Sequence, residues 1–507
     1  PFAGRLVLVK SKLDKPALVK FRLDKAGIFM IIDEPVKNEK RTRWEKMEFI
    51  GRKKELAALE HAYQAQGSAF MPVYGRRRVG KSELIKHFIK DKQALYFLGK
   101  QAPPRLQLKE FLRNGASALN QPLLEQARAD DWQEAISLVL KQVSAEKKIV
   151  VVMDEFQWTA GACPELPSIL QSFIDDDWGA RCKVFLILCG SYMGFMEKKV
   201  LGEKSPLFGR RSGQIFLKPF SFLEAGKFHP HRSTTEKAKV FFICGGIPYY
   251  LKFFSQAESV DIDIRKNFLN EFSALAREPE FLLREELKEL KKYFGILTAL
   301  STGAVNNREM ARITGIEERS LFYYLNNLVE LGYIAKHYPL AGLKPNPKQV
   351  HYKLQDPLLR FWFRFIYPNG SAIYQMDEKN AFMNLIKPYL VPYFGHCYEI
   401  LCRDALGLLY RKEGLTCSYE VGEYWDKDVQ IDLVGYRRDG VVDIGECKWG
   451  KVSSMGRLLK ELKMKIASYP NRDNKTINGR LFLRYRRKLP DDSNIQVNSL
   501  DDLYSLA

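Results

Sequence analysis

A glycine-rich loop between an apolar run and an amphipathic segment constrains this chain more than any other feature. Residues 70–89 read FMPVYGRRRVGKSELIKHFI: a strand-length apolar run, then G-x-x-x-x-G-K-S, then a segment typical of a helix. Glycines allow such a loop to wrap tightly, so that its backbone N–H groups converge on an anion. The stretch therefore predicts an α/β fold, in which the loop joins a buried strand to a helix whose N-terminus faces phosphate groups.

Each residue of the loop has a predicted part in holding ATP and its metal ion. Lys81 is expected to reach the β and γ phosphates, and the Ser82 hydroxyl is expected to ligate Mg²⁺. Backbone N–H groups would surround the phosphates along Gly75, Arg76, Arg77, Arg78, Val79 and Gly80. The three arginine side chains either add charge to the phosphate site or turn outward to DNA, and the sequence does not choose between these roles.

A second apolar run, downstream of the loop, ends in paired carboxylates. Residues 148–157 read KIVVVMDEFQ, which predicts a buried parallel strand with acids at its carboxyl end, where ligands bind in open α/β sheets. Asp154 is expected to hold the Mg²⁺ shell through water, and Glu155 to orient and activate the attacking water. A phosphate loop followed by this acidic pair predicts ATP hydrolysis.

Two more segments supply candidate residues for the same site. The apolar run 184–189 ends in Gly-Ser, and Ser191 is expected either to sense the γ phosphate or to cap a helix. Residues 205–211 read SPLFGRR, and a guanidinium suits a transferring phosphoryl group because it is always charged and donates bidentately. Arg210 or Arg211 is therefore a candidate arginine finger, within one subunit or from a neighbour in a homo-oligomer. A solvent-exposed or DNA-facing pair is the alternative.

The charge balance of the chain points to a polyanionic partner. The 507 residues include 80 Lys and Arg against 60 Asp and Glu, a formal net charge of +20, which favours nucleic acid over the alternative of a solvated lysine surface. No apolar run reaches the roughly 20 residues of a membrane span, so no membrane partner is expected. The eight cysteines include no C-x-x-C pair, which indicates a reducing cytoplasm rather than disulfides or a zinc site.

The pattern of elements divides the chain into six predicted segments. Residues 1–46 start without methionine and show no strong period, so they are expected to be an extension, a fusion remnant or an upstream reading-frame artefact, with a small β-rich arm as the alternative. The other segments are an ATPase core (47–225), a helical lid (226–283), a winged helix (284–355), an aromatic linker (356–385) and a nuclease-like domain (386–507).

The predicted winged helix rests on an order of helix, glycine turn, helix and two strands over residues 284–355, after a first helix over 285–300. Residues 317–332 form its second, amphipathic helix. The expected inward residues are Leu321, Leu325, Leu328 and Val329. The residues left to face a groove are Arg319, Ser320, Tyr323, Tyr324 and Asn327. Contact with DNA and a role in protein interaction both stay open.

Two strand-like runs of the last domain, QIDLV and VVDIGECKW, carry acidic residues. Residues two apart in a strand share a face, so Glu446 and Lys448 are expected to point together. Asp432 and Glu446 would bind Mg²⁺ through hard oxygen ligands, and Glu399 would complete the metal shell from a preceding helix. Lys448 would stabilise developing charge or position the attacking water. The alternative is a surface ion pair between Glu446 and Lys448.

The motifs taken in order resemble one family. They are GRRRVGKS, VVMDEFQW, LCGS, SPLFGRR, GGIPYYL, the winged-helix pattern, LQDPLLRFWFRFIYPN and QIDLV…GECKWGK. They are similar to those of archaeal-type ATPases, from archaea and some bacteria, that carry a C-terminal restriction-endonuclease-like domain. The resemblance covers residues 47–490 and implies an AAA/STAND-like P-loop core, related to replication-initiator ATPases, joined to a PD-(D/E)XK fold. Gln430 departs from the family, since relatives often have an acid there.

These features predict an α/β protein that binds and hydrolyses ATP with Mg²⁺ and also binds DNA. Its ATPase would gate a Mg²⁺-dependent nuclease domain that serves DNA processing or genome defence. The rival hypothesis is a non-cleaving ATP switch that binds DNA or a protein partner. Gln430 favours the rival, because a second carboxylate is missing there, and the pair Glu446 and Lys448 favours the nuclease.

Overall fold

The computed structural model describes most of the chain after residue 48 and two short strands before it. The described ranges are 21–23, 29–31, 49–144, 147–177, 182–254, 258–342, 344–487 and 495–506. The two strands, β1 (Phe21–Leu23) and β2 (Phe29–Ile31), pair antiparallel within a separate unit, Pro1–Phe49. The rest of the predicted N-terminal extension lies outside the described residues. All elements named below belong to the second unit, Ile50–Ala507.

A five-stranded parallel sheet forms the core of the N-terminal half, in the order β4-β5-β6-β3-β7. Its strands are β3 (Ala69–Tyr74), β4 (Ala94–Leu98), β5 (Lys148–Asp154), β6 (Lys183–Gly190) and β7 (Ile215–Phe216). The predicted α/β class with a parallel sheet is confirmed. Since the strands are parallel, the loop after β3, the acids after β5 and the serine after β6 share one edge of the sheet.

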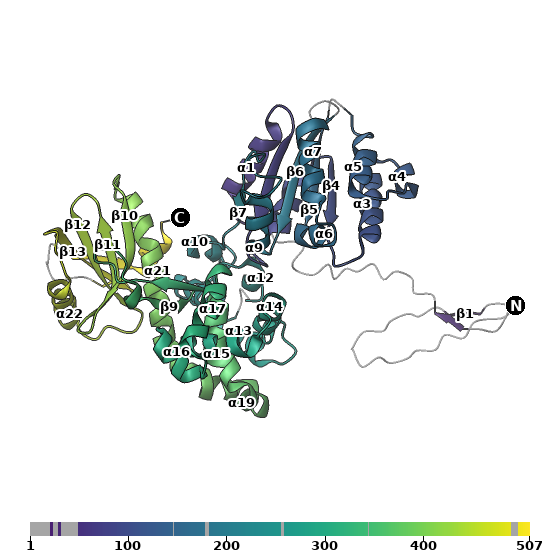
Figure 1. Ribbon diagram of the computed structural model, residues 1–507. Helices are drawn as coiled ribbons and strands as arrows, with labels where there is room; N and C mark the ends of the chain where they lie inside the picture. Colours follow the sequence, from purple (N-terminus) through teal and green to yellow (C-terminus); the bar gives the residue numbers. More distant parts are fainter. Residues whose placement is uncertain are drawn as a thin grey trace. The chain divides into compact units, whose positions relative to one another are not determined.

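Helices cover both faces of this sheet (Figure 1). One face is packed by α1 (Lys53–Gln64) and α2 (Lys81–Ile89), where the rings of Phe88 and Phe185 meet edge to face. The other face is packed by α3 (Pro104–Leu119), α5 (Trp132–Leu140) and α7 (Leu166–Ser172), with the short α4 (Leu123–Gln126) beside α3. Every β-strand residue of β3 and nearly all of β5 and β6 are buried, as expected of a strand covered on both sides.

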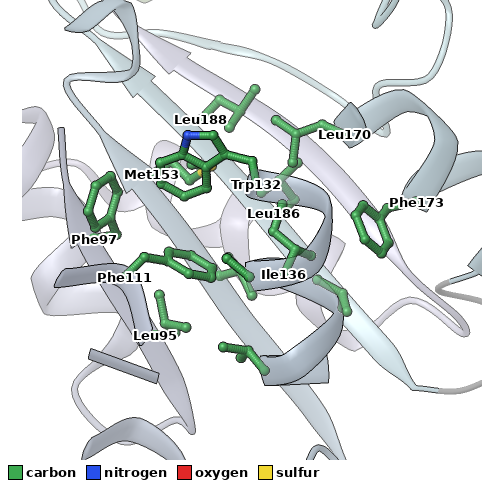
Figure 2. Packing of buried hydrophobic residues seen from close by; sticks show 14 of the residues in the cluster. Leu95, Phe97, Phe111, Trp132, Ile136, Met153, Leu170, Phe173, Leu186 and Leu188 are labelled. Atoms are coloured by element: carbon green, nitrogen blue, oxygen red, sulfur yellow. The ribbon is translucent and has the colours of Figure 1, made fainter. Parts of the chain in front are cut away.

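The core of the second face is aromatic (Figure 2). Trp132 at the start of α5 packs edge to face against Phe97 of β4 and Phe111 of α3, with ring centroids 5.5 and 5.3 Å apart. Met153, Leu186 and Leu188 close the cluster from the sheet. Edge-to-face rings gain electrostatic attraction beyond the apolar area that they bury, so this cluster fixes α3 and α5 on the sheet.

Further helices lie between the later strands of the parallel sheet and after its last strand. They are α6 (Phe156–Ala162), η1 (Phe173–Asp177), α9 (Met193–Phe195), η2 (Met196–Leu201), α10 (Phe222–Gly226), α11 (Thr234–Cys244), α12 (Pro248–Leu251), α13 (Val260–Ile264), η3 (Arg265–Leu269) and α14 (Glu278–Glu286). The predicted single helix over 285–300 is wrong. Leu287 is extended, so α14 ends at Glu286 and α15 (Leu290–Ser301) begins anew.

A group of three helices and two strands comes next. They are α15, α16 (Asn307–Thr314), α17 (Glu318–Glu330), β8 (Ile334–His337) and β9 (His351–Leu354), and the strands pair antiparallel. Leu321, Leu325 and Leu328 are buried as expected. Tyr324 is also buried, which corrects its predicted position toward a groove. Its hydroxyl donates to Glu289 and accepts from Lys292, so a polar tip is satisfied while the ring packs inward.

An aromatic segment then joins this group to the last domain. It comprises α18 (Pro357–Phe361), η5 (Trp362–Ile366), η6 (Tyr367–Asn369), α19 (Gly370–Gln375), α20 (Glu378–Ala381), η7 (Phe382–Ile386) and η8 (Lys387–Tyr389). Trp362 and Phe363 are buried against Phe294 of α15, and the Trp362 indole donates to the Ala276 carbonyl. The segment therefore packs between elements, the role that its apolar sequence predicts.

The last domain is a mixed five-stranded sheet with a helix on each face (Figure 1). Its strands are β10 (Tyr419–Trp425), β11 (Gln430–Arg437), β12 (Val441–Lys448), β13 (Thr476–Leu483) and β14 (Ile495–Ser499). The helices are α21 (Leu390–Lys412) and α22 (Met455–Ser468), and α23 (Leu500–Tyr504) is the last element described. The helix α21 approaches β11 so closely that a Cβ on Gly435 would lie 2.0 Å from the Tyr410 hydroxyl.

Two further observations concern the whole described chain. None of its helices is both long enough and apolar enough to cross a membrane, within the residues that the structure describes. All eight cysteines are free thiols.

Replacing Trp132 by alanine tests the aromatic core. Trp132 is 2% exposed, and its truncation leaves a large cavity, so we expect the free energy of unfolding to fall by about 3–5 kcal/mol. Chemical denaturation followed by circular dichroism measures this change. Leu123→Ala is the control, because Leu123 is 78% exposed and should cost little. Equal losses in the two variants would contradict the packing described for α5.

Candidate functional site

The loop after β3 adopts a backbone that its glycines make accessible. Gly75 and Gly80 have φ values of +149° and +95°, and Arg78 also lies in the left-handed region at +66°. A Cβ on Gly75 would lie 2.4 Å from the Leu217 carbonyl oxygen, so no other residue fits there without movement of the backbone. The loop thus passes tightly from β3 to the first residue of α2, Lys81, as the motif predicts.

Lys81 lies over the loop rather than in solvent. Its Nζ donates to the carbonyl oxygens of Gly75 and Arg76, at 2.9 and 3.0 Å. Burial lowers the pKa of Lys81, and the nearby carboxylates Glu155 and Asp154 act in the opposite direction. The ammonium is therefore held at the centre of the loop, beside the acids that end β5.

Ser82 and Asp154 meet as the sequence predicts for a pair that holds Mg²⁺. The Ser82 hydroxyl donates to Asp154 Oδ2 at 2.6 Å, and Asp154 is 1% exposed. Tyr96 of β4 donates to the same oxygen. A hydroxyl and a carboxylate are hard oxygen ligands, so these residues fit a magnesium ion. Sequence reasoning missed Tyr96, because one tyrosine in a short strand carries no motif.

Burial and the Asp154 charge together raise the pKa of Tyr96. Its phenol thus stays protonated and acts as a donor to Asp154 at neutral pH. The second donor keeps the carboxylate of Asp154 turned toward Ser82, which fixes the orientation of the pair.

Glu155 is restrained by two neighbours. Its backbone is left-handed, with φ +49°, at the N-terminus of α6. The Ser191 hydroxyl lies 2.8 and 2.6 Å from the two Glu155 carboxylate oxygens, and the Gln157 amide donates to one of them. Tyr192 rather than Ser191 precedes α9 as its N-terminal cap residue. Ser191 thus lies beside the candidate catalytic carboxylate, where a sensor of the phosphate would be placed.

The three loop arginines take neither of the two orientations considered from the sequence. Each forms an ion pair with an acid from residues 278–356. The pairs are Arg76 with Asp356 at 2.6 Å, Arg77 with Glu285, and Arg78 with Glu278. Two of the guanidinium groups also lie over rings: Arg76 over Tyr333 at 4.8 Å and Arg78 over Tyr249 at 4.3 Å. We call these three pairs the arginine contacts.

The arginine contacts hold later helices against the phosphate loop and leave little open space beside it. A cavity of ≈ 10 Å³ remains between the loop, β6 and the following helices. Its walls include Arg76, Arg77, Ser191, Leu282, Glu286 and Tyr333. Such a space holds about one water molecule at most, so α14 and the residues before β8 pack directly against the phosphate loop.

The two arginines predicted as candidate fingers lie on the surface. Arg210 donates bidentately to Asp175, with both N–O distances at 2.7 Å, and Arg211 is exposed. The Arg210 guanidinium is therefore already paired with the Asp175 carboxylate. The role of either residue as an arginine finger remains a prediction.

The acids of the last domain lie on adjacent strands β11 and β12. Lys448 contacts Glu446 Oε1 at 2.6 Å, so these two residues share a face as predicted. A second lysine, Lys465 of α22, contacts Glu446 Oε2 at 2.5 Å and lies 3.9 Å from Asp432. The Cys447 N–H donates to Asp432 at 3.1 Å. The sequence analysis missed Lys465, although the apolar period of α22 indicates which side of that helix faces the sheet.

The charge of Glu446 affects the pKa of its neighbour Asp432. Burial, then the neighbouring charges of Glu446 and Glu399, raise the pKa of Asp432 to about 7. Lys465 acts in the opposite direction. Asp432 thus gains a proton near neutral pH unless a cation offsets its burial.

The predicted metal shell of three carboxylates is not assembled. Among the described residues, no group of three or more His, Cys, Asp or Glu side chains is placed to hold a metal ion. Glu399 lies 3.5 Å from His396 on its own helix, while two lysines neutralise Glu446. Asp432 and Glu446 alone are a suitable pair of hard ligands, but Lys465 occupies the space between them.

Comparison with known proteins gives two family matches. Residues 49–254 match an ATPase domain predominantly from Archaea, and residues 362–460 match a family of archaeal and bacterial proteins of unknown function. An uncharacterised protein of Methanocaldococcus jannaschii is 29% identical over 408 residues, which are 79% of this chain and 87% of the relative.

Solved structures that resemble the chain are more distant. The Walker-type ATPase PABY2304 of Pyrococcus abyssi is 18% identical, with a TM-score of 0.47, and the match covers 62% of this chain and 96% of that one. The ORC2 protein of Aeropyrum pernix is 15% identical, with a TM-score of 0.42, over 65% and 95% of the two chains. The loop geometry and the match to residues 49–254 agree that this part of the chain is a P-loop ATPase domain.

Proposed function

We propose that the protein is an ATP-driven switch, in which nucleotide at the phosphate loop controls how the later helices and the C-terminal domain engage DNA. The arginine contacts carry this proposal, because they join the phosphate loop directly to residues 278–356. A change in the conformation of the loop would therefore move the elements within residues 278–356 that these ion pairs hold.

ATP and the acids compete for the same cations. The phosphates of ATP would lie at a loop whose arginine charges are already engaged by Asp356, Glu285 and Glu278. Guanidinium groups bind carboxylate and phosphate with the same bidentate geometry. ATP binding would thus weaken the arginine contacts and release α14 and the residues before β8 from the loop. In the absence of nucleotide, the contacts would hold these elements against it.

Asp356 extends the coupling to the aromatic segment. It is 2% exposed, and while one carboxylate oxygen holds Arg76, the other accepts from the Leu359 N–H and caps α18. Loss of the Arg76 contact would leave a buried carboxylate without its cation, which is strongly unfavourable. The start of α18 would therefore respond to the state of the loop.

For hydrolysis, Lys81 would bind the β and γ phosphates, while Ser82 and Asp154 would hold Mg²⁺, which supplies charge neutralisation of the phosphate oxygens when bound. Glu155 would orient the attacking water. Since Ser191 and Gln157 both donate to Glu155, movement of Ser191 toward a γ phosphate would free one carboxylate oxygen for that water. Arg210 or Arg211 is the candidate finger, after release from Asp175 in the case of Arg210.

Contact with DNA is supported by charge and exposure. The chain has a net charge of +20, and α17 presents Arg319, Ser320 and Tyr323 to solvent. A helix with a polar and aromatic outer side, followed by an antiparallel strand pair, suits insertion into a groove as a winged helix. A partner protein at the same helix is the alternative.

A second candidate function is DNA cleavage by the C-terminal domain. The observation that favours it is the convergence of Asp432, Glu446 and Lys448 on adjacent strands. Lys448 would stabilise negative charge on a phosphodiester. Cleavage would require Asp432 and Glu446 to be released from Lys465, so the domain as folded fits a binding role without further change.

Substitution of Lys81 tests the ATPase assignment. Lys81→Ala removes the ammonium expected to bind the transferring phosphate, so ATP turnover should fall at least roughly a hundredfold in a phosphate-release assay. Lys90→Ala is the matched control, because Lys90 is exposed at the end of the same helix. Turnover at the wild-type rate in Lys81→Ala would exclude the loop as the site of hydrolysis.

Asp356→Asn tests the coupling. Asparagine retains the cap of α18 but removes the charge that competes with ATP for Arg76, so the Kd for a fluorescent ATP analogue should fall about tenfold. Asp377→Asn makes the same change at the cap of α20 and should leave the Kd unaltered. An unchanged Kd in Asp356→Asn would show that the arginine contacts do not oppose nucleotide binding.

Cleavage is tested with linear, circular and single-stranded DNA, with Mg²⁺ or Mn²⁺, and with or without ATP. If the domain cleaves, wild-type activity should disappear in Lys448→Ala and persist in Lys460→Ala, whose lysine is exposed on α22. ATP turnover without cleavage of any substrate would instead support the non-cleaving switch.

A further inference from the structure

A cavity of ≈ 470 Å³ lies apart from the phosphate loop, where α15, β9, α18, α21 and β10 meet. Its walls carry several cationic and aromatic side chains. They include Arg360, Arg364, His396, Tyr389, Tyr393 and Trp425. The volume falls in the range of small-molecule sites, and Gln430 at its edge precedes Asp432 on the same strand by two residues.

Arg360 is the feature that calls for a ligand. It is 8% exposed, and its Nε and Nη1 atoms are buried without a hydrogen-bond partner among the described residues. The charge of Arg360 acts to lower the pKa of Asp404 on α21, although burial raises that pKa. No hydrogen bond joins the two side chains in the described part of the chain. A buried guanidinium with unused donors is strongly unfavourable, and a bound anion or water would relieve this cost.

The acid that lines the cavity does not serve Arg360. Glu423 is 3% exposed. Lys353 Nζ donates to both of its carboxylate oxygens, at 2.7 and 2.6 Å. His337 also lies 3.2 Å from it. Burial opposes ionisation of Glu423, but His337, Arg403 and Lys353 outweigh it and hold its pKa below the ordinary value. Glu423 is therefore neutralised by other cations, and the charge of Arg360 remains available.

A second guanidinium stands beside the first. Arg364 lies four residues after Arg360, one helical turn along, and lines the same cavity. Two guanidinium groups on one helical side offer planar pairs of N–H donors, the arrangement that binds phosphate oxygens bidentately. Tyr389, which is 53% exposed, gives the cavity an aromatic edge suited to a sugar or base.

We propose that this cavity binds the phosphate group of a nucleotide unit, held by Arg360 and Arg364, with Tyr389 against its sugar or base. The unit is either a free nucleotide or the terminal nucleotide of a DNA strand. In the second case Gln430 would lie between the bound phosphate and Asp432, and the cavity would position a strand end at the acidic pair. The site does not depend on the proposed ATP switch.

The test uses the full chain in a Lys81→Ala background, so that phosphate binding at the loop is suppressed. The probes are inorganic phosphate, deoxyadenosine monophosphate, and a short single-stranded oligonucleotide with either a 5′-phosphate or a 5′-hydroxyl. Calorimetric titration gives the Kd for each probe, and thermal unfolding gives the shift in Tm.

Arg360→Met should weaken binding of deoxyadenosine monophosphate at least tenfold. It should also raise the Tm of the ligand-free protein, because an apolar side chain of similar size replaces an unpaired buried charge. Arg364→Gln, at a half-buried position, should weaken binding with little change in Tm, and it keeps the proposal testable if Arg360→Met does not fold. Arg457→Gln is the control, because Arg457 is 83% exposed on α22.

The probes separate the two sources of the phosphate. Tighter binding of the 5′-phosphorylated oligonucleotide than of its 5′-hydroxyl form supports a strand end, and binding of the mononucleotide alone supports a free nucleotide. The proposal is overturned if Arg364→Gln and Arg360→Met bind the probes as the parent does. It is equally overturned if no probe binds at millimolar concentration, since water alone then satisfies Arg360.

Discussion

The hydrogen bond between Ser82 and Asp154 is the contact on which the rest of the ATPase domain depends. It joins the start of α2 to the end of β5, although β6 lies between β3 and β5 in the sheet. Only a parallel order of these strands brings the loop and the carboxylate to one edge. Burial of β3, β5 and β6 by helices on both faces makes that edge rigid. The same edge then presents Lys81 and Glu155 to one small region of space.

Charged side chains in the interior of this basic chain occur mostly as ion pairs. Cations that are buried or half-buried are matched to buried acids: Arg76 to Asp356, Arg480 to Asp443, and Lys353 to Glu423. Such pairs stabilise little by themselves, but loss of one partner is costly, so they favour one arrangement of the elements over others. Two of these pairs join segments far apart in sequence. The unmatched Arg360 stands out against this background.

The sequence predicts those parts of the molecule that depend on short-range order. The phosphate loop, the strand ending in Asp154 and the pairing of Glu446 with Lys448 all follow from spacing within one element. Tyr96, Lys465 and the arginine contacts do not, because each depends on which distant element packs beside it. The predicted helix over 285–300 fails for a related reason. Three non-helical residues, 287–289, beginning with the extended Leu287, interrupt an otherwise helical pattern and let α14 and α15 pack separately.

Lys448 and Lys465 give Glu446 its own permanent counterions. The charge of Glu446 is therefore balanced by side chains of the polypeptide itself. Chelators should leave the sheet of the C-terminal domain intact, unlike that of a domain built around an ion. A mutation that removes either lysine would create a demand for an external cation. One or two substitutions would thus separate a sheet whose Glu446 is neutralised by lysine from a sheet whose Glu446 needs a metal ion.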